Sequence, residues 1–228
     1  PVSRPLVGVE RLKGHITRAA EEGNSQGIER FLARLSKVTR THSANELLDF
    51  MRRNDLPIAQ DGSIIAYKKL RRRDGKYVDS HSGKVIQRVG SKVFMAESMV
   101  DPNRRNECSN GLHVGRRNYM GSFGGDVITL IKIAPEDVIA VPRDYQGGKM
   151  RCCGYHIVAE VSAKGFELLN DDQPMTDDEK MAKLLTNVIE GNHIPVMEYV
   201  EITEAKGGGL KITPANQKSI IEDGKLSA

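Results

Sequence analysis

Apolar residues recur every three or four positions in the first part of the chain, a spacing that predicts helices over residues 6–22 and 26–39. In the second segment they form one stripe, made of Ile28, Phe31, Leu32 and Leu35. A third helix is expected from the capping-box pattern Ser43-Ala-Asn-Glu46 to about Asn54, because Pro57 drives the residue before it toward extended geometry.

After Asp61-Gly62 the pattern changes to short apolar runs separated by turn residues, which is typical of strands. The expected strands cover residues 63–70, 76–80, 84–88, 92–96, 126–133 and 137–141, with one long extended run over 149–161. Residues 97–107 are polar and are expected to form an exposed loop.

A last helix is predicted from Thr176, which can cap an acidic first turn, to about Glu190. Residues 205–228 contain three consecutive glycines and few apolar side chains, so a flexible tail or interaction arm is expected. Helices followed by strands favour an α+β fold. We expect a helical N-terminal region (residues 1–56), a mixed, mostly antiparallel β domain (57–169), and a C-terminal helix with an acidic arm (170–228).

Charge is distributed unevenly along the chain. The 228 residues carry a net charge of +4, but residues 1–75 carry +6 and residues 164–228 carry −5. This separation indicates an electrostatic role within the chain or toward a partner. The overall balance is too mild to indicate nucleic-acid binding by itself.

The cysteines and the short apolar runs indicate the cellular location that we expect for the protein. Cys108, Cys152 and Cys153 are odd in number and two are adjacent, which fits reduced thiols in a cytosol. No apolar run approaches the ~20 residues that span a bilayer, and the first residues lack the apolar core of a signal peptide. We expect a soluble cytoplasmic protein that could reach a membrane through a partner.

Residues 108–123 are the stretch with the most candidate chemistry. They combine Cys108, His113, a glycine-built turn and the arginine pair Arg116-Arg117, directly before a predicted strand. Turns between regular elements are where a rigid scaffold commonly presents a site.

Several short motifs, in order and spacing, resemble the C-terminal domain of the rIIB proteins of T-even bacteriophages over residues of about 44–161. The motifs are Leu47-Leu-Asp-Phe50, Asn54-Asp55, Asp61-Gly62, Ala66-Tyr67-Lys68, Asp79, His81-Ser82, Cys108-Ser109, Gly111-Leu-His-Val114, Tyr119, Phe123, Asp137-Val138, Pro142, Asp144-Tyr145, Lys149-Met150-Arg151, Cys153 and Tyr155. The helix-turn-helix-like start of that family has no obvious counterpart here, and the residues after 170 fall outside the resemblance.

This resemblance implies a phage accessory protein that acts through protein–protein interaction, in lysis timing, superinfection exclusion or phage structure. It implies an rIIA-like partner or self-association. The implied location is the host cytoplasm, at the inner face of the inner membrane where a partner holds it there, and incorporation into the virion stays open. The family brings no enzymatic activity with it.

The candidate site comprises the polar and aromatic residues of these motifs: Tyr67, Lys68, Asp79, His81, Cys108, His113, Tyr119 and Cys153. Some are metal-ligand types, but the two complete ligand pairs typical of a zinc site are missing, so we predict no metal and no cofactor. A cysteine nucleophile would need an oriented base that the sequence does not identify. No catalytic residue is assigned.

Two alternatives stay open. Gly111-Leu-His-Val-Gly, Tyr119 and the strand after it are similar to the centre of ADP-ribosyltransferase-like domains, which allows an enzyme or nucleotide-binding domain with Glu160 as the late glutamate. The basic cluster of Lys69, Arg71, Arg72 and Arg73 fits a solvated loop. Its alternative is contact with nucleic-acid phosphate, anionic lipid headgroups or an acidic protein.

Overall fold

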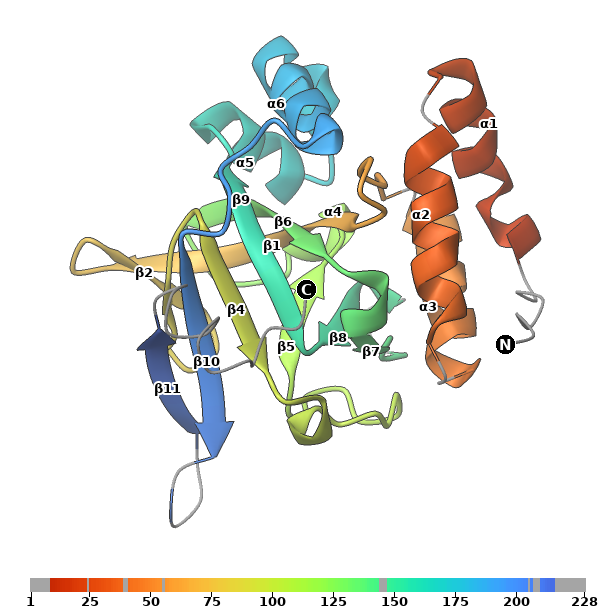
Figure 1. The fold of residues 1–228 in the computed structure, drawn as a ribbon. Coiled ribbons are helices and arrows are strands. Elements are labelled where there is room, and N and C mark those ends of the chain that lie inside the picture. Colours follow the sequence, from red (N-terminus) through yellow and green to blue (C-terminus); the bar gives the residue numbers. More distant parts are fainter. Residues whose placement is uncertain are drawn as a thin grey trace.

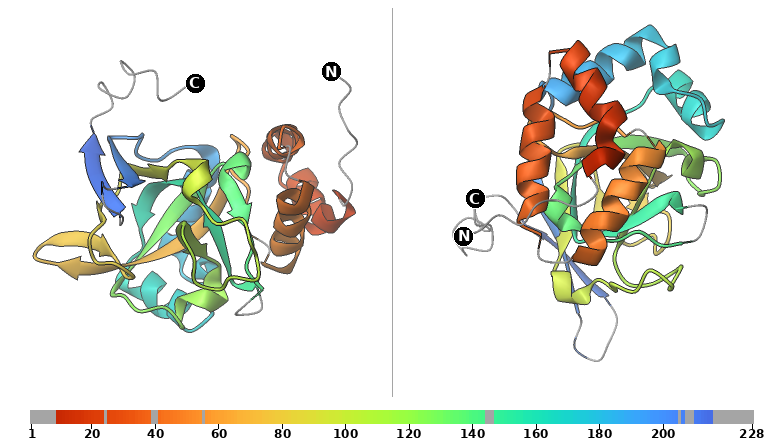
Figure 2. Two further views of the ribbon diagram at one scale, coloured as in Figure 1. Left: turned by 90° about the horizontal axis from the view of Figure 1, so that it is seen from below. Right: turned by 90° about the vertical axis from the view of Figure 1, so that its right-hand side faces the viewer.

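The computed structural model describes residues 9–23, 25–38, 41–54, 56–143, 147–204, 206 and 210–215, and it has a layer of N-terminal helices beside a curved sheet, with further helices at one end of that sheet (Figure 1). The left view of Figure 2 shows the N-terminal helices on one side of the sheet. This arrangement confirms the α+β class.

The N-terminal layer consists of a short 3-10 helix, Val9–Leu12, and helices α1 (Lys13–Glu21), α2 (Ser25–Ser36) and α3 (Thr41–Asn54). The apolar stripe of α2 is buried in the core through Ile28, Phe31 and Leu35, as its period predicts. The prediction that a capping box starts the third helix at Ser43 is wrong. Helix α3 begins at Thr41, and Ser43 lies inside the helix. Glu46 instead forms a 3.0 Å ion pair with Arg104, a tertiary contact that a local pattern cannot indicate.

One sheet holds all the strands in the described part of the chain, in the order β11-β10-β4-β9-β6-β1-β5-β8-β7, with β2 and β3 extending from β1. The strands are β1 (Ile64–Arg73), β2 (Lys76–Asp79), β3 (Ile86–Gln87), β4 (Ser91–Met95), β5 (Leu112–Gly115), β6 (Val127–Ile133), β7 (Val138–Ala140), β8 (Lys149–Cys152), β9 (Gly154–Glu160), β10 (Glu198–Glu204) and β11 (Leu210–Ala215). The pair β10–β4 is parallel and the other named pairs are antiparallel, which confirms a mixed, mostly antiparallel sheet.

The long extended run over residues 149–161 is in fact two strands. β8 pairs with β5 and β7, whereas β9 pairs with β4 and β6 on the other side of β1. Cys153 lies at the corner between them, and its backbone N–H donates to the Asp137 carbonyl. The sequence shows no clear break because no proline interrupts the run.

Three α-helices follow the first strands: α4 (Arg117–Met120), α5 (Ala163–Asn170) and α6 (Glu179–Glu190), with short 3-10 helices at Glu97–Met99, Pro135–Asp137 and Met175–Asp177. The sequence pattern missed α5, which Ser162 caps by accepting from the Gly165 N–H. The cap of α6 is Asp178, which accepts from the Met181 N–H, and not Thr176, which lies in the preceding 3-10 helix.

The C-terminal part of the chain joins the same sheet. β10 lies parallel to β4, and β11 pairs antiparallel with β10. The expectation of a flexible tail is therefore wrong for residues 210–215, and residues 216–228 lie outside the described residues. The three-part domain division stays a prediction. No helix in the described ranges is long and apolar enough to cross a membrane.

Candidate functional site

Strand β1 places neighbouring candidates on opposite faces of the sheet, because successive side chains of a strand alternate. Tyr67 points toward α1, α4 and the residues before α6, where it lines a cavity. Lys68 points the other way, with its Nζ donating to the His113 carbonyl at 2.6 Å and lying 5.4 Å from the Tyr155 ring centroid. Burial lowers the pKa of Lys68. Tyr67 and Lys68 therefore cannot serve one site together.

Lys69 is separate from the three arginines with which the sequence grouped it. It is 4% exposed, and its Nζ donates to the Met120 carbonyl at 2.9 Å and to Asn170 Oδ1 at 2.6 Å. The Phe166 ring centroid lies 4.9 Å away. Lys69 thus fastens β1 to α4 and α5, while Arg71 to Arg73 are exposed at the end of the strand.

His113 is held neutral inside the sheet. Burial is the largest cause that lowers its pKa, to about 3, and the nearby cations Lys68, Lys149 and Arg151 add to it. Arg151 is fully buried opposite His113 on β8, where its Nη2 donates to the carbonyl of Asn103 at 2.7 Å. Protonation of His113 would add another buried charge of the same sign, so it is a poor proton carrier near pH 7.

The cysteines occupy three different environments. Cys108 is exposed, Cys152 is buried and Cys153 is half-buried. Burial raises the pKa of the Cys152 thiol, and the Cys153 thiol lies 3.6 Å from Asp137 Oδ1 as a weak donor. Among the described residues, no group of three or more His, Cys, Asp or Glu side chains is placed to hold a metal ion.

Asp79 builds the turn between β2 and β3. Its carboxylate accepts from the N–H groups of Ser82, Lys84 and Val85. Burial acts to raise the pKa of Asp79, but the hydrogen bonds from Ser82 and Val85 outweigh it, and the pKa is lowered. His81 is exposed on this turn.

Tyr119 belongs to the joint that connects β5 to α4, as its place after the glycine-built turn suggests. Its ring is 8% exposed and packs 5.5 Å from the Phe123 ring, centroid to centroid. A Cβ at Gly115 would lie 2.7 Å from Tyr119 Cδ1 and 2.8 Å from Met120 Cε, so only glycine fits at the end of β5. The tyrosine is a packing residue that fixes the direction of α4.

Tyr67, His113, Tyr119 and Glu160 do not line a common cavity. Glu160 lies instead at the base of the β1–β2 hairpin, where it pairs with Arg72 at 2.6 Å and accepts from the Tyr77 hydroxyl. The glutamate that an ADP-ribosyltransferase-like site would require is thus engaged elsewhere.

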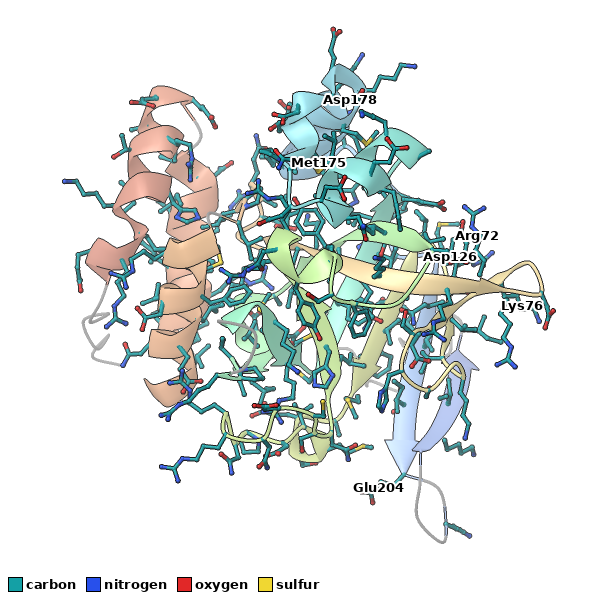
Figure 3. All side chains as sticks on the ribbon, turned by 180° about the vertical axis from the view of Figure 1, so that it is seen from behind. Arg72, Lys76, Asp126, Met175, Asp178 and Glu204 are labelled. Carbon is teal, nitrogen blue, oxygen red and sulfur yellow. The ribbon has the colours of Figure 1, made fainter. Side chains whose placement is uncertain are left out.

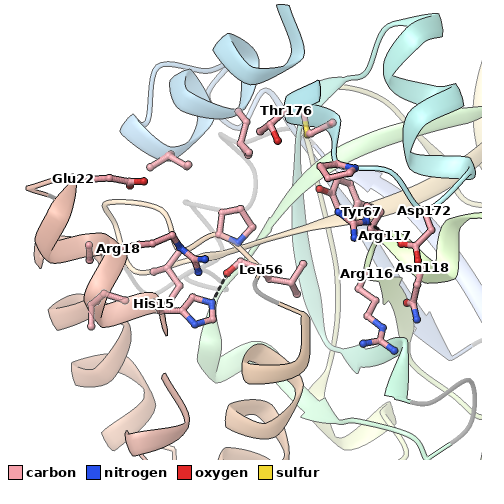
Figure 4. A pocket seen from close by; sticks show the side chains of 18 residues that line it. His15, Arg18, Glu22, Leu56, Tyr67, Arg116, Arg117, Asn118, Asp172 and Thr176 are labelled. Atoms are coloured by element: carbon pink, nitrogen blue, oxygen red, sulfur yellow. Dashed lines mark hydrogen bonds and ion pairs between the residues drawn. The ribbon is translucent and has the colours of Figure 1, made fainter. Parts of the chain in front are cut away.

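A cavity lies between the N-terminal helices and the sheet, and we call it the helix–sheet groove (Figure 4). It encloses about 800 Å³. The N-terminal helices line it with His15, Arg18, Glu22 and Ile28, and the segment before β1 lines it with Leu56, Pro57 and Ile58. The sheet and α4 contribute Tyr67, Arg116, Arg117 and Asn118. The segment around α6 contributes Asp172, Met175, Thr176, Leu185 and Ile189. His15 Nε2 contacts the Leu56 carbonyl at 2.9 Å and so fixes α1 against the segment before β1.

The groove has charges of both signs around apolar patches. Arg117 Nε donates to Asp172 Oδ1 at 2.9 Å, and both side chains are about half exposed. Burial raises the pKa of Tyr67 to about 12, although the nearby Arg117 opposes the shift. The Tyr67 hydroxyl therefore keeps its proton at neutral pH. No described residue forms a hydrogen bond with it, so it is available to a ligand in the groove.

Sequence reasoning found Tyr67 and the pair Arg116-Arg117 but not the groove. The remaining lining residues come from α1, α2 and α4, from the segment before β1 and from the segment around α6. They are ordinary helix and loop residues with no shared motif, and only the fold brings them together.

Comparison with known proteins gives a family match. The family model described as "Bacteriophage T4 protein rIIB" matches residues 21–165. The chain is 34% identical over 134 residues to the protein named "Protein rIIB" of Enterobacteria phage T4, covering 58% of this chain and 42% of that relative. The chain therefore spans less than half the length of the relative it matches. No solved structure matches.

Proposed function

The chain belongs to the rIIB family of bacteriophage proteins, and we propose that it is an accessory protein that binds another protein through the helix–sheet groove. The supporting observation is the composition of the groove: paired charges of both signs surround apolar side chains. Protein interfaces commonly combine an apolar centre with a charged rim that sets orientation and partner choice.

The groove is well suited to a segment of a partner chain with an apolar centre and charged side chains of both signs at its ends. Arg117 and Tyr67 provide donors on the sheet side, and Ile28, Leu185 and Ile189 provide apolar surface on the helical side. Arginine and tyrosine are also the residue types that contribute most to binding energy in protein interfaces. An rIIA-like phage protein is the partner we propose, with a role in lysis timing, superinfection exclusion or phage structure.

A nucleotide is the second candidate ligand, because about 800 Å³ is the size of small-molecule pockets and Tyr67 lies beside arginines. Glu22 and Asp172 argue against it, since carboxylates on the same walls would repel phosphate groups. Calorimetry with NAD and ATP separates the two: saturable binding that Tyr67→Ala abolishes would favour the nucleotide.

The protein-binding proposal is tested by co-expression with the rIIA-like protein of the same phage. Arg117→Glu places a second carboxylate beside Asp172 and should weaken co-purification about tenfold or more. Arg105→Glu is the matched control, because Arg105 is exposed and does not line the groove. Equal binding by both variants would contradict the proposal.

Self-association is measured on the chain alone by sedimentation at several concentrations. Dimers that Arg117→Glu disrupts would replace the heterologous partner with a second copy of the chain.

A phage that carries Arg117→Glu should also lyse its host on the schedule of a deletion mutant, read from culture turbidity, while the Arg105→Glu phage follows the wild type.

A further inference from the structure

The end of the β1–β2 hairpin extends beyond the rest of the sheet. β1 pairs with β6 only as far as Leu70, and its last three residues pair with β2 alone. Figure 1 shows this ribbon protruding from the sheet, and Figure 3 shows Lys76 at its tip with Arg72 nearer the body. A two-stranded ribbon of this kind is one of the elements that enter the major groove of duplex DNA.

This ribbon and the turn after it concentrate positive charge. Residues 71–88 contain six Lys or Arg and two Asp, a net charge of +4, which equals that of the whole chain. Arg71, Arg72 and Arg73 are exposed. One exposed large apolar side chain, Ile86 at 48%, lies on β3 beside β2. That is far less apolar surface than membrane-inserting segments bury, so the composition favours a polyanion over a lipid bilayer.

A pocket of about 310 Å³ lies between the arginines and the turn formed by residues 80–83. Arg73 Nη1 lies 3.5 Å from the position that a Cβ at Gly83 would take. Arg71 Nη2 lies 3.0 Å from the corresponding position at Gly124. The two glycines thus leave room for the guanidinium groups, with the exposed His81 on the same pocket wall.

The charges of this pocket differ in how far they are already neutralised. Arg72 is paired with Glu160 and lies 5.5 Å from the Tyr77 ring centroid. The Asp79 carboxylate is held by the hydrogen bonds of its own turn. Neither Arg71 nor Arg73 forms an ion pair with any residue that the structure describes. Both guanidinium groups can therefore donate hydrogen bonds to an external anion.

We propose that this hairpin pocket binds the phosphate backbone of nucleic acid, with Arg71 and Arg73 as the phosphate contacts. The two side chains lie on one face of the ribbon, ~7 Å apart along it, so that they can reach separate phosphates of one strand. Their fork of N–H donors matches the phosphate oxygens. Binding is independent of base sequence, because backbone contacts carry no sequence information.

The test measures fluorescence anisotropy of a labelled DNA duplex and a labelled single-stranded RNA against the full chain over a range of salt concentrations. Arg71→Gln with Arg73→Gln should weaken binding and lower the slope of log K against log salt by about 2, because each lost phosphate contact contributes ~0.9. The double change to lysine should retain the slope, since charge is kept.

The matched control removes two other exposed cations, with Arg52→Gln and Arg105→Gln. Unchanged melting temperatures show that each variant is folded. Equal loss in the control pair, or no duplex and no RNA binding at about 50 mM salt, would overturn the proposal. Binding to phosphatidylserine vesicles or to polyglutamate in preference to nucleic acid would also overturn it and assign the pocket to lipid or to an acidic protein.

Discussion

Individual polar residues that looked like site candidates mostly hold the fold together. Lys68 links β1 to β5, and Asp79 organises a turn. Their residue types were visible in the sequence, but their roles depend on which face of a strand they occupy, and this depends on pairing. For Tyr119, by contrast, the sequence did indicate the structural role. Its position after a glycine-built turn indicated a structural joint, and it lies in one.

The first prediction concerns Gly115. Replacement by alanine places a methyl group 2.7 Å from the Tyr119 ring, so we expect the free energy of unfolding to fall by about 1–3 kcal/mol. Gly14→Ala is the control: nothing lies within 4 Å of its added Cβ in α1, and alanine is the better helix former. Urea denaturation compares them, and equal loss in both variants would show that the joint is not tightly packed.

The second prediction concerns the half-buried histidines His113 and His156. Burial, with Lys68, Lys149, Arg151 and His81 nearby, lowers the pKa of His113 to about 3. Burial, with His193, Lys92 and Lys132 nearby, lowers the pKa of His156 to about 4. Both pKa values lie below the ~6.5 of an unfolded histidine. As pH falls below 6.5 the unfolded chain binds protons that the folded chain excludes, so the free energy of unfolding decreases.

This pH dependence is measured by urea denaturation between pH 7 and pH 5, above the range where unfolded carboxyl groups titrate. His113→Gln should reduce the slope by at most ~1.4 kcal/mol per pH unit. His156→Gln should reduce the slope in the same way, because burial lowers the pKa of His156 as well. A slope that His113→Gln does not alter would mean that His113 binds its proton as readily in the folded chain as in the unfolded chain.

At the scale of elements, periodicity predicted the N-terminal helices and most strands. The prediction from periodicity failed where strand pairing, and not the local sequence, decides the structure. The run over residues 149–161 is uniformly extended, yet its halves belong to opposite sides of β1. Residues 210–215 looked like a tail because they follow three glycines, and they form a strand through their pairing with β10.

The third prediction separates the two possible caps of α6. Asp178 accepts from the Met181 N–H at 3.1 Å, so Asp178→Ala should lower the free energy of unfolding by about 0.5–2 kcal/mol. Thr176→Ala should change it by less than about 0.5 kcal/mol, because Thr176 is exposed in the preceding 3-10 helix. The opposite order in thermal unfolding would restore the sequence-based assignment.

At the scale of the molecule, the parallel pairing of β10 with β4 brings the C-terminal segment into the central sheet. The groove arises because α1, the sheet and the segment before α6 meet at one place. No sequence pattern predicts such a meeting point, since its walls are far apart in the chain. The basic hairpin lies outside this groove, so its binding and that of the groove can be tested separately.

Site-specific photo-crosslinking during infection tests whether the groove binds a partner protein. A photoreactive phenylalanine analogue replaces exposed Thr176 in the groove or, as control, exposed Asn110 outside it. We expect a covalent adduct with the rIIA-like protein from position 176 and none from position 110. An adduct with that protein from position 110 alone, or from neither position, would mean that the groove is not the binding site.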